Sequence, residues 1–135
     1  MILHQNSIIQ LTYNPAADIL EVRYPDLYTS FLSEARENLK LMVEAIHNYD
    51  VKNLLLDAST TAIEVSPEES RELTMQLAKE LAQTRLRKVA RIQPQDPTKE
   101  IRAQENIRQL ERGIILPYQL RTFADRAAAL KWLAS

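Results

Sequence analysis

The stretch LLLDASTTAIEVSPEESREL, residues 54–73, joins an apolar run, a polar connection and the opening of a helix. Its first four residues end the segment VKNLLLD, residues 51–57. This is a short apolar run bounded by polar residues, which is typical of a strand covered on at least one face. Farther along, Ser66 can cap the free amides of a helix, Pro67 suits the first helical position, and Glu69 completes a capping box. The stretch predicts a strand followed by a helix, and the polar edge after Asp57 is either a site or only their connection.

The segments on either side show the same alternation of extended and helical patterns. Residues 7–13 and 18–24 are rich in apolar and β-branched side chains, and the turn-forming NPAA between them predicts a hairpin. An apolar stripe at helical spacing occupies residues 30–49, and Asp96 and Asp125 are further N-caps. The expected strands are 7–13, 18–24, 51–57, 87–92 and 118–123, and the expected helices are 30–49, 66–84, 97–112 and 126–135.

This order, β-β-α-β-α-β-α-β-α, predicts an α/β fold with a single mixed, mostly parallel five-stranded sheet. Strands that alternate with helices call for parallel neighbours joined by right-handed crossovers, and the opening hairpin adds one antiparallel strand. The length of 135 residues fits one domain, 1–135, and no linker or low-complexity tract divides it.

The charge is nearly balanced overall but unevenly distributed. The net charge of −1 argues against a general nucleic-acid binder. Residues 1–67 carry 4 basic and 9 acidic residues (net −5), whereas residues 68–135 carry 13 basic and 9 acidic residues (net +4). The excess, much of it in RLRKVAR, is either a solvated face that pairs with the acidic half or a surface for an acidic partner or an anionic head group.

Three absences narrow the expected location of the chain. No window approaches about 18 uninterrupted apolar residues, so no transmembrane segment is expected. The N-terminus lacks a basic region followed by an apolar block, so no secretory signal is visible, and no cysteine is present for a disulfide. A cytoplasmic protein is therefore expected.

The polar edge after the central strand is the best candidate constellation. It consists of Asp57, Ser59, Thr60, Thr61 and Ser66. Ligands of open α/β sheets gather beyond the carboxyl ends of parallel strands, where this edge should lie. The alternative is that the carboxylate and hydroxyls only satisfy loop amides and local turns.

A second candidate is the aromatic segment YPDLYTSF. Tyr24, Tyr28 and Phe31 lie between the hairpin and the first long helix. They either close the end of the core or line an apolar mouth, as a lipid or small-ligand binder requires.

Other chemistry has little support, and no catalytic, cofactor-binding or metal-binding residues are assigned. The only histidines are His4, in a terminus expected to be loose, and His47, on the polar side of the first helix, and neither shows ligand spacing. Gly113, the expected stop of the third helix, is the only glycine, whereas phosphate loops need several. A hydrolase or other enzyme would need a deep polar pocket around Asp57.

The element order, with LLLDAS ending the third strand, resembles the STAS superfamily. The tail LRTFADRAAALKWL is the most telling match, since Arg121 and Phe123 end a strand, Asp125 caps a helix, and Ala129 precedes the pair Trp132–Leu133. The closest branch is the SpoIIAA-like group of small bacterial proteins, which is also grouped with the CRAL-TRIO lipid-binding fold. The resemblance implies one sheet with the main helices on one face.

The resemblance also implies two activities. STAS-type antagonists of anti-sigma factors switch partners when a serine at the start of the second helix is phosphorylated, and counting from Asp57 reaches Ser66. Val65, Pro67 and Glu68 depart from the motif around that serine, which favours a structural cap. The lipid-transfer relatives instead hold an apolar ligand.

The expected function is therefore a non-enzymatic STAS-like regulatory or protein-interaction module of unassigned pathway. The alternative is a carrier of a small apolar or lipid ligand, and the third choice is a weak hydrolase or other enzyme. The expected partner is a protein of unknown identity, and a homodimer is a further expectation because an edge strand needs cover.

Overall fold

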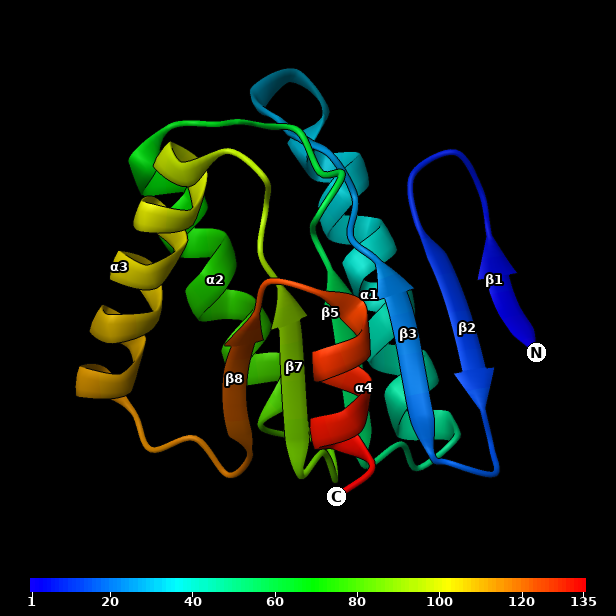
Figure 1. The fold of residues 1–135 in the computed structure, drawn as a ribbon. Helices are drawn as coiled ribbons and strands as arrows, with labels where there is room; N and C mark the ends of the chain where they lie inside the picture. The colour runs from blue at the N-terminus through cyan, green and yellow to red at the C-terminus, as the bar shows by residue number, and fades with distance from the viewer.

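Six strands form one mixed sheet with helices on both faces (Figure 1). The computed structural model describes residues 1–135. The strands of the main sheet, in the spatial order β1-β2-β3-β5-β7-β8, are β1 (Ile2–Gln5), β2 (Gln10–Asn14), β3 (Ile19–Arg23), β5 (Asn53–Asp57), β7 (Lys88–Ile92) and β8 (Gln119–Phe123). The helices are α1 (Leu32–Asn48), α2 (Pro67–Leu81), α3 (Pro97–Gly113) and α4 (Arg126–Leu133).

The pairing directions follow from the connections. β2 is antiparallel to both of its neighbours, β1 and β3, whereas β3, β5, β7 and β8 are parallel neighbours. The Asn14 side chain accepts hydrogen bonds from the amides of Ala16 and Ala17 and so holds the predicted turn between β2 and β3. The predicted α/β class and mixed sheet are confirmed.

The predicted strand count was wrong, because β1 adds a sixth strand. The backbone amide of Tyr13 donates to the carbonyl of Met1 at 2.8 Å, and the residues around His4 pair with β2. The terminus around His4 is therefore an edge strand and not a loose end. Its connection to β2 is stabilised by the Asn6 side chain, which accepts hydrogen bonds from the amides of Ile8 and Ile9.

Two short strands outside the main sheet were also missing from the predicted order. β4 (Leu27–Tyr28) and β6 (Ile63–Glu64) pair in parallel, and the 3₁₀ turn Thr29–Phe31 follows β4. A further hydrogen bond runs from the amide of Leu27 to the carbonyl of Ala62. Strands of two residues are too short to produce an alternating pattern, so the sequence carried no signal for them.

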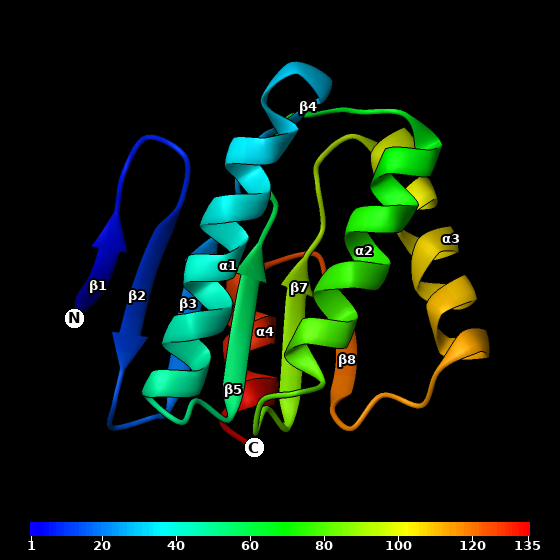
Figure 2. The ribbon, with the colours of Figure 1, turned by 180° about the vertical axis from the view of Figure 1, so that it is seen from behind.

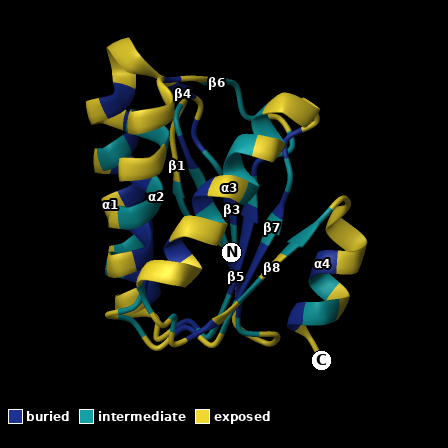
Figure 3. Ribbon diagram, turned by 90° about the vertical axis from the view of Figure 1, so that its left-hand side faces the viewer, coloured by how far each residue is buried: buried dark blue, intermediate teal, exposed yellow.

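Alternation along the central strands creates two cores, one on each face of the sheet, and helices cover both faces (Figures 2 and 3). Leu54 and Leu56 of β5 belong to the larger core, with apolar residues of α1 and α2. Leu55 faces the other way and belongs to a smaller core with Ala129 and Leu133 of α4. The helices α1, α2 and α3 therefore lie on one face and α4 on the other.

The helix ends match the capping signals in most cases. Ser66 and Glu69 form both halves of a capping box at α2, and Asp96 and Asp125 cap α3 and α4. Gly113 ends α3, as expected, but it has no positive φ, so the helix stops without a left-handed residue. None of the four helices combines the length and the apolar character needed to cross a membrane.

Candidate functional site

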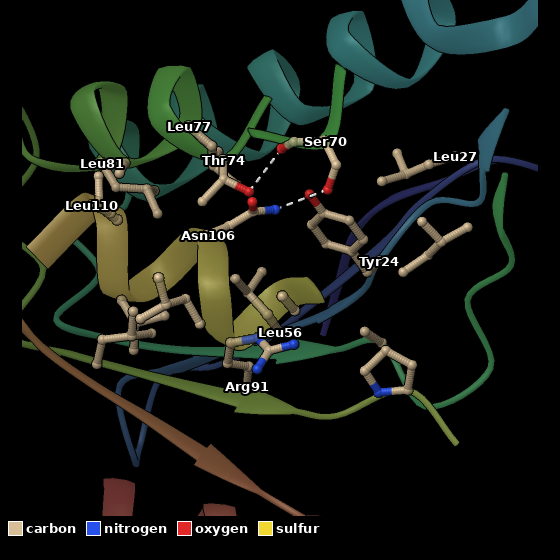
Figure 4. Close-up of a pocket in the computed structure, with 18 of the residues that line it drawn as sticks. Tyr24, Leu27, Leu56, Ser70, Thr74, Leu77, Leu81, Arg91, Asn106 and Leu110 are labelled. Carbon is tan, nitrogen blue, oxygen red and sulfur yellow. Dashed lines mark hydrogen bonds between the residues drawn. The ribbon is translucent and has the colours of Figure 1, made fainter. Parts of the chain in front are cut away.

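A cavity of about 140 Å³ lies between α2, α3 and the sheet (Figure 4). Of the 19 residues that line it, 14 are hydrophobic, so its walls are mainly apolar. The strands contribute side chains such as Leu56, Val89 and Leu120, and Tyr118 lies just before β8.

The cavity exists because α3 packs on α2 more closely than on the sheet. Only Asn106 and Leu110 of this 17-residue helix are buried, and its mainly polar sequence gives it few apolar side chains to insert. The space left above β7 and β8 is bounded by Ala103 and Ile107 of α3. The third helix is therefore the outer wall of the cavity.

Part of the lining is a chain of hydrogen bonds between the two helices. The Asn106 side-chain amide donates to the Ser70 hydroxyl at 2.9 Å, and the Thr74 hydroxyl donates to the Ser70 carbonyl at 2.9 Å. Asn106 is 8% exposed, so this interhelical bond satisfies a buried amide. Figure 4 shows the three residues lying together at the cavity.

A charged network connects the sheet to the outer wall. The Arg91 guanidinium on β7 makes two hydrogen bonds to the Glu100 carboxylate on α3, at 2.9 and 3.1 Å, and donates to the Thr122 hydroxyl at 3.0 Å. Gln104 donates to the same carboxylate and hydroxyl. Both ionic side chains are 13% exposed, so the positive charge that lines the cavity is already neutralised.

Two tyrosines that line the cavity have raised pKa values. Burial raises the pKa of Tyr24 to about 12, although the nearby charge of Arg91 acts in the opposite direction. Burial alone raises the pKa of Tyr118 to about 12. Both pKa shifts show surroundings that disfavour a charged phenolate.

Polar and apolar groups are segregated along the cavity. On α2, Ser70 and Thr74 precede Leu77 and Leu81 at helical spacing, so the polar groups lie toward the start of the helix and the apolar groups toward its end. On the sheet, Arg91 lies near the carboxyl end of β7. One end of the cavity is thus polar and the other apolar.

Asp57 lies at the carboxyl end of β5, as predicted, but it does not line the cavity. Its Oδ1 accepts hydrogen bonds from the Ser59 amide at 2.9 Å and the Ser59 hydroxyl at 2.6 Å. Its side chain alternates with Leu56 and so lies toward α4, where Glu21 and, to a smaller extent, Asp57 raise the pKa of Arg126. In the structure, the Asp57 carboxylate therefore stabilises the turn that follows β5.

Two of the remaining residues of the polar edge, Thr61 and Ser66, are engaged in hydrogen bonds with other parts of the protein. The Thr61 hydroxyl donates to the Tyr24 carbonyl at 3.1 Å, and the Ser66 hydroxyl accepts from the Glu69 amide at 3.1 Å. Thr60 is exposed. The edge is therefore a connected surface and not a pocket.

The aromatic segment divides between two places. Tyr24 lines the cavity, whereas Tyr28 and Phe31 lie at a separate surface hollow with Asp26 and Glu34. The side chains of Tyr28 and Phe31 are 37% and 60% exposed. Only one of the three candidate residues thus belongs to the apolar cavity.

Most of the polar residues that line the cavity were not predicted from the sequence. The signal for Asn106 was available, because it falls on the apolar stripe of α3 with Ala103 and Leu110 at spacings of three and four. Ser70 likewise precedes Leu73 and Leu77 on the inner side of α2. In general, a polar residue on the buried stripe of a helix indicates a polar group in the wall of a cavity or at a helix contact.

No three histidine, cysteine or carboxylate side chains come together as a group that could hold a metal ion. Comparisons with protein-family models, curated proteins and solved structures give no match for this chain.

Proposed function

We propose that this protein binds a small, mainly apolar molecule in the cavity between α2, α3 and the sheet. The observation that carries the proposal is a cavity of about 140 Å³ in which 14 of the 19 lining residues are hydrophobic. The cavity is partly open to water, so part of its apolar wall is still solvated. Covering this wall with an apolar ligand removes apolar surface from water, which favours binding.

The size of the cavity indicates the size of the ligand. A cavity of about 150 Å³ lined by aliphatic side chains takes up benzene, so this one suits a single ring or a short branched chain. The proposal agrees with the carrier function that the resemblance to the CRAL-TRIO fold implies, but for a ring-sized ligand rather than a long-chain lipid.

Filling the cavity should abolish binding. Ala103→Leu extends a side chain of the outer wall into the cavity, and we expect binding of toluene to weaken at least tenfold because its space is occupied. The free energy of unfolding should stay within about 1 kcal/mol of the original protein, since added contacts offset any strain. Toluene titration followed by amide NMR shifts, together with urea denaturation, measures both effects.

The matched control is Ala127→Leu, the same change at an exposed position of α4 on the opposite face. It should leave toluene binding unchanged. Native mass spectrometry of gently purified protein adds a second readout, in which bound mass appears on the original protein and on Ala127→Leu but not on Ala103→Leu. Toluene binding that survives Ala103→Leu would contradict the proposal.

A second candidate function is protein contact at the polar edge, as the resemblance to STAS modules implies. The pairing of β4 with β6 brings Tyr28 beside Glu64, and the Thr29 hydroxyl donates to Glu69 in the capping box of α2 at 2.9 Å. The exposed Phe31 therefore lies close to the edge that ends at Ser66. Together they form a surface with both aromatic and polar groups.

Phe31→Ser tests this second function without disturbing the fold. Phe31 is the N-cap of α1 and has no side-chain capping bond, and serine is a favoured capping residue. We expect captured proteins to be lost from Phe31→Ser but retained by Ile115→Ser, a control at an isoleucine that is 96% exposed. Quantitative pull-down with the three baits decides, and identical captured proteins would count against a protein contact here.

A further inference from the structure

The charge balance of the cavity restricts the chemistry of its ligand. Arg91 is the only ionised residue among the lining side chains, and its guanidinium is bound to the Glu100 carboxylate through two hydrogen bonds. No unpaired cation is left to receive a carboxylate or phosphate. An anionic ligand would lose its hydration without a compensating partner, and a cationic one would meet Arg91.

The polar end of the cavity nevertheless offers hydrogen bonds. The Tyr24 hydroxyl has no partner within the protein, and Asn106 uses its amide nitrogen on Ser70 and leaves its carbonyl oxygen available. In the view of Figure 4, the Tyr24 hydroxyl points toward the hydrogen bond between Ser70 and Asn106. No buried side-chain nitrogen or oxygen lacks a partner, so these free atoms are accessible ones.

We propose that the ligand is an uncharged, ring-sized molecule with one hydroxyl or similar hydrogen-bonding group. This inference rests on the proposed function and specifies its ligand class. The polar group lies against Tyr24 and Asn106, and the apolar body lies among Leu77, Leu81 and Leu110. A fully apolar ligand of the same size would fill the same space but would make neither of these hydrogen bonds.

Three single-ring probes separate the effect of a hydroxyl on binding from the effect of a charge. Phenol is neutral with a hydroxyl, toluene is neutral without one, and benzoate is charged. Amide NMR titration should show that phenol binds about 3- to 10-fold more tightly than toluene, the factor that a neutral hydrogen bond supplies. Benzoate should bind at least tenfold more weakly than toluene, because its charge must be desolvated.

Tyr24→Phe removes only the hydroxyl and keeps the ring that lines the cavity. It should lower phenol binding to the level of toluene and leave toluene binding unchanged. Benzoate that binds as tightly as phenol, or a Tyr24→Phe variant that weakens phenol and toluene equally, would overturn this inference alone. Failure of all three probes to bind the original protein would overturn the proposed function as well.

Discussion

Glu100→Gln should destabilise the protein by about 2–4 kcal/mol, because it leaves the Arg91 guanidinium without its counter-charge at a nearly buried position. Both side chains of this pair are 13% exposed, so water can replace the lost carboxylate only in part. The pair also joins β7 to α3, whose other main contact is with α2. Urea denaturation followed by circular dichroism measures the change in the free energy of unfolding.

The chain contains a matched control for this prediction. Arg126 and Glu21 also form two hydrogen bonds, at 2.9 and 2.7 Å, but their side chains are 57% and 29% exposed. Glu21→Gln should cost less than about 1 kcal/mol, because water solvates the remaining charge. If the two substitutions cost the same, burial does not decide the strength of the Arg91 pair.

Removing both charges at once gives the internal check. The double variant Arg91→Met/Glu100→Leu should recover much of the stability lost in Glu100→Gln, since no unpaired charge remains near the cavity. A double variant as unstable as the single one would mean that the contribution of Glu100 lies in packing and not in charge.

The fold was predictable wherever a local signal agreed with the tertiary structure. The capping box of Ser66 and Glu69 located the start of α2, and Asp96 and Asp125 located the starts of α3 and α4, because a helix terminus needs partners for its free amides. β1 escaped prediction because a strand of four residues next to a terminus carries almost no periodicity. Its turn residue, Asn6, was the available signal.

The candidate site was harder to predict. The face of the sheet on which a side chain lies depends on its position in the strand and not on composition. Leu54 and Leu56 face α1 and α2, so Asp57 must lie on the side of Leu55 and α4. The alternation alone therefore separates Asp57 from the face that carries the cavity. Which face holds a cavity is set by the packing of α3 on α2, and that is a tertiary property.

The location of the Arg91 charge and its ion-pair partner could not be predicted from the sequence either. In the run RLRKVAR it counted as one of several basic residues on a solvated face or a surface for an acidic partner. Alternation places Arg91 with Val89 on the cavity side of β7 and Ala90 on the side of α4. Its partner, Glu100, comes from the same basic half of the chain, which the net charges of the two halves could not indicate.

Leu133→Ala should destabilise the protein by about 2–4 kcal/mol, because it opens a space in the smaller core. Leu133 is 3% exposed and Ala129 is fully buried, and together they hold α4 against Leu55 and Ala90. A helix of eight residues is far below the length that is stable alone in water, so its packing on the sheet supplies its stability. The free energy of unfolding measures the loss, and hydrogen exchange of the α4 amides locates it.

Leu41→Ala is the matched control, since it removes the same atoms from a side chain of α1 that is 38% exposed. Its cost should stay within about 1 kcal/mol, as expected at a largely solvated position. Toluene binding should survive Leu133→Ala, because α4 and the cavity lie on opposite faces of the sheet. If α4 amides exchange no faster in Leu133→Ala than in Leu41→Ala, contacts other than this leucine hold the helix in place.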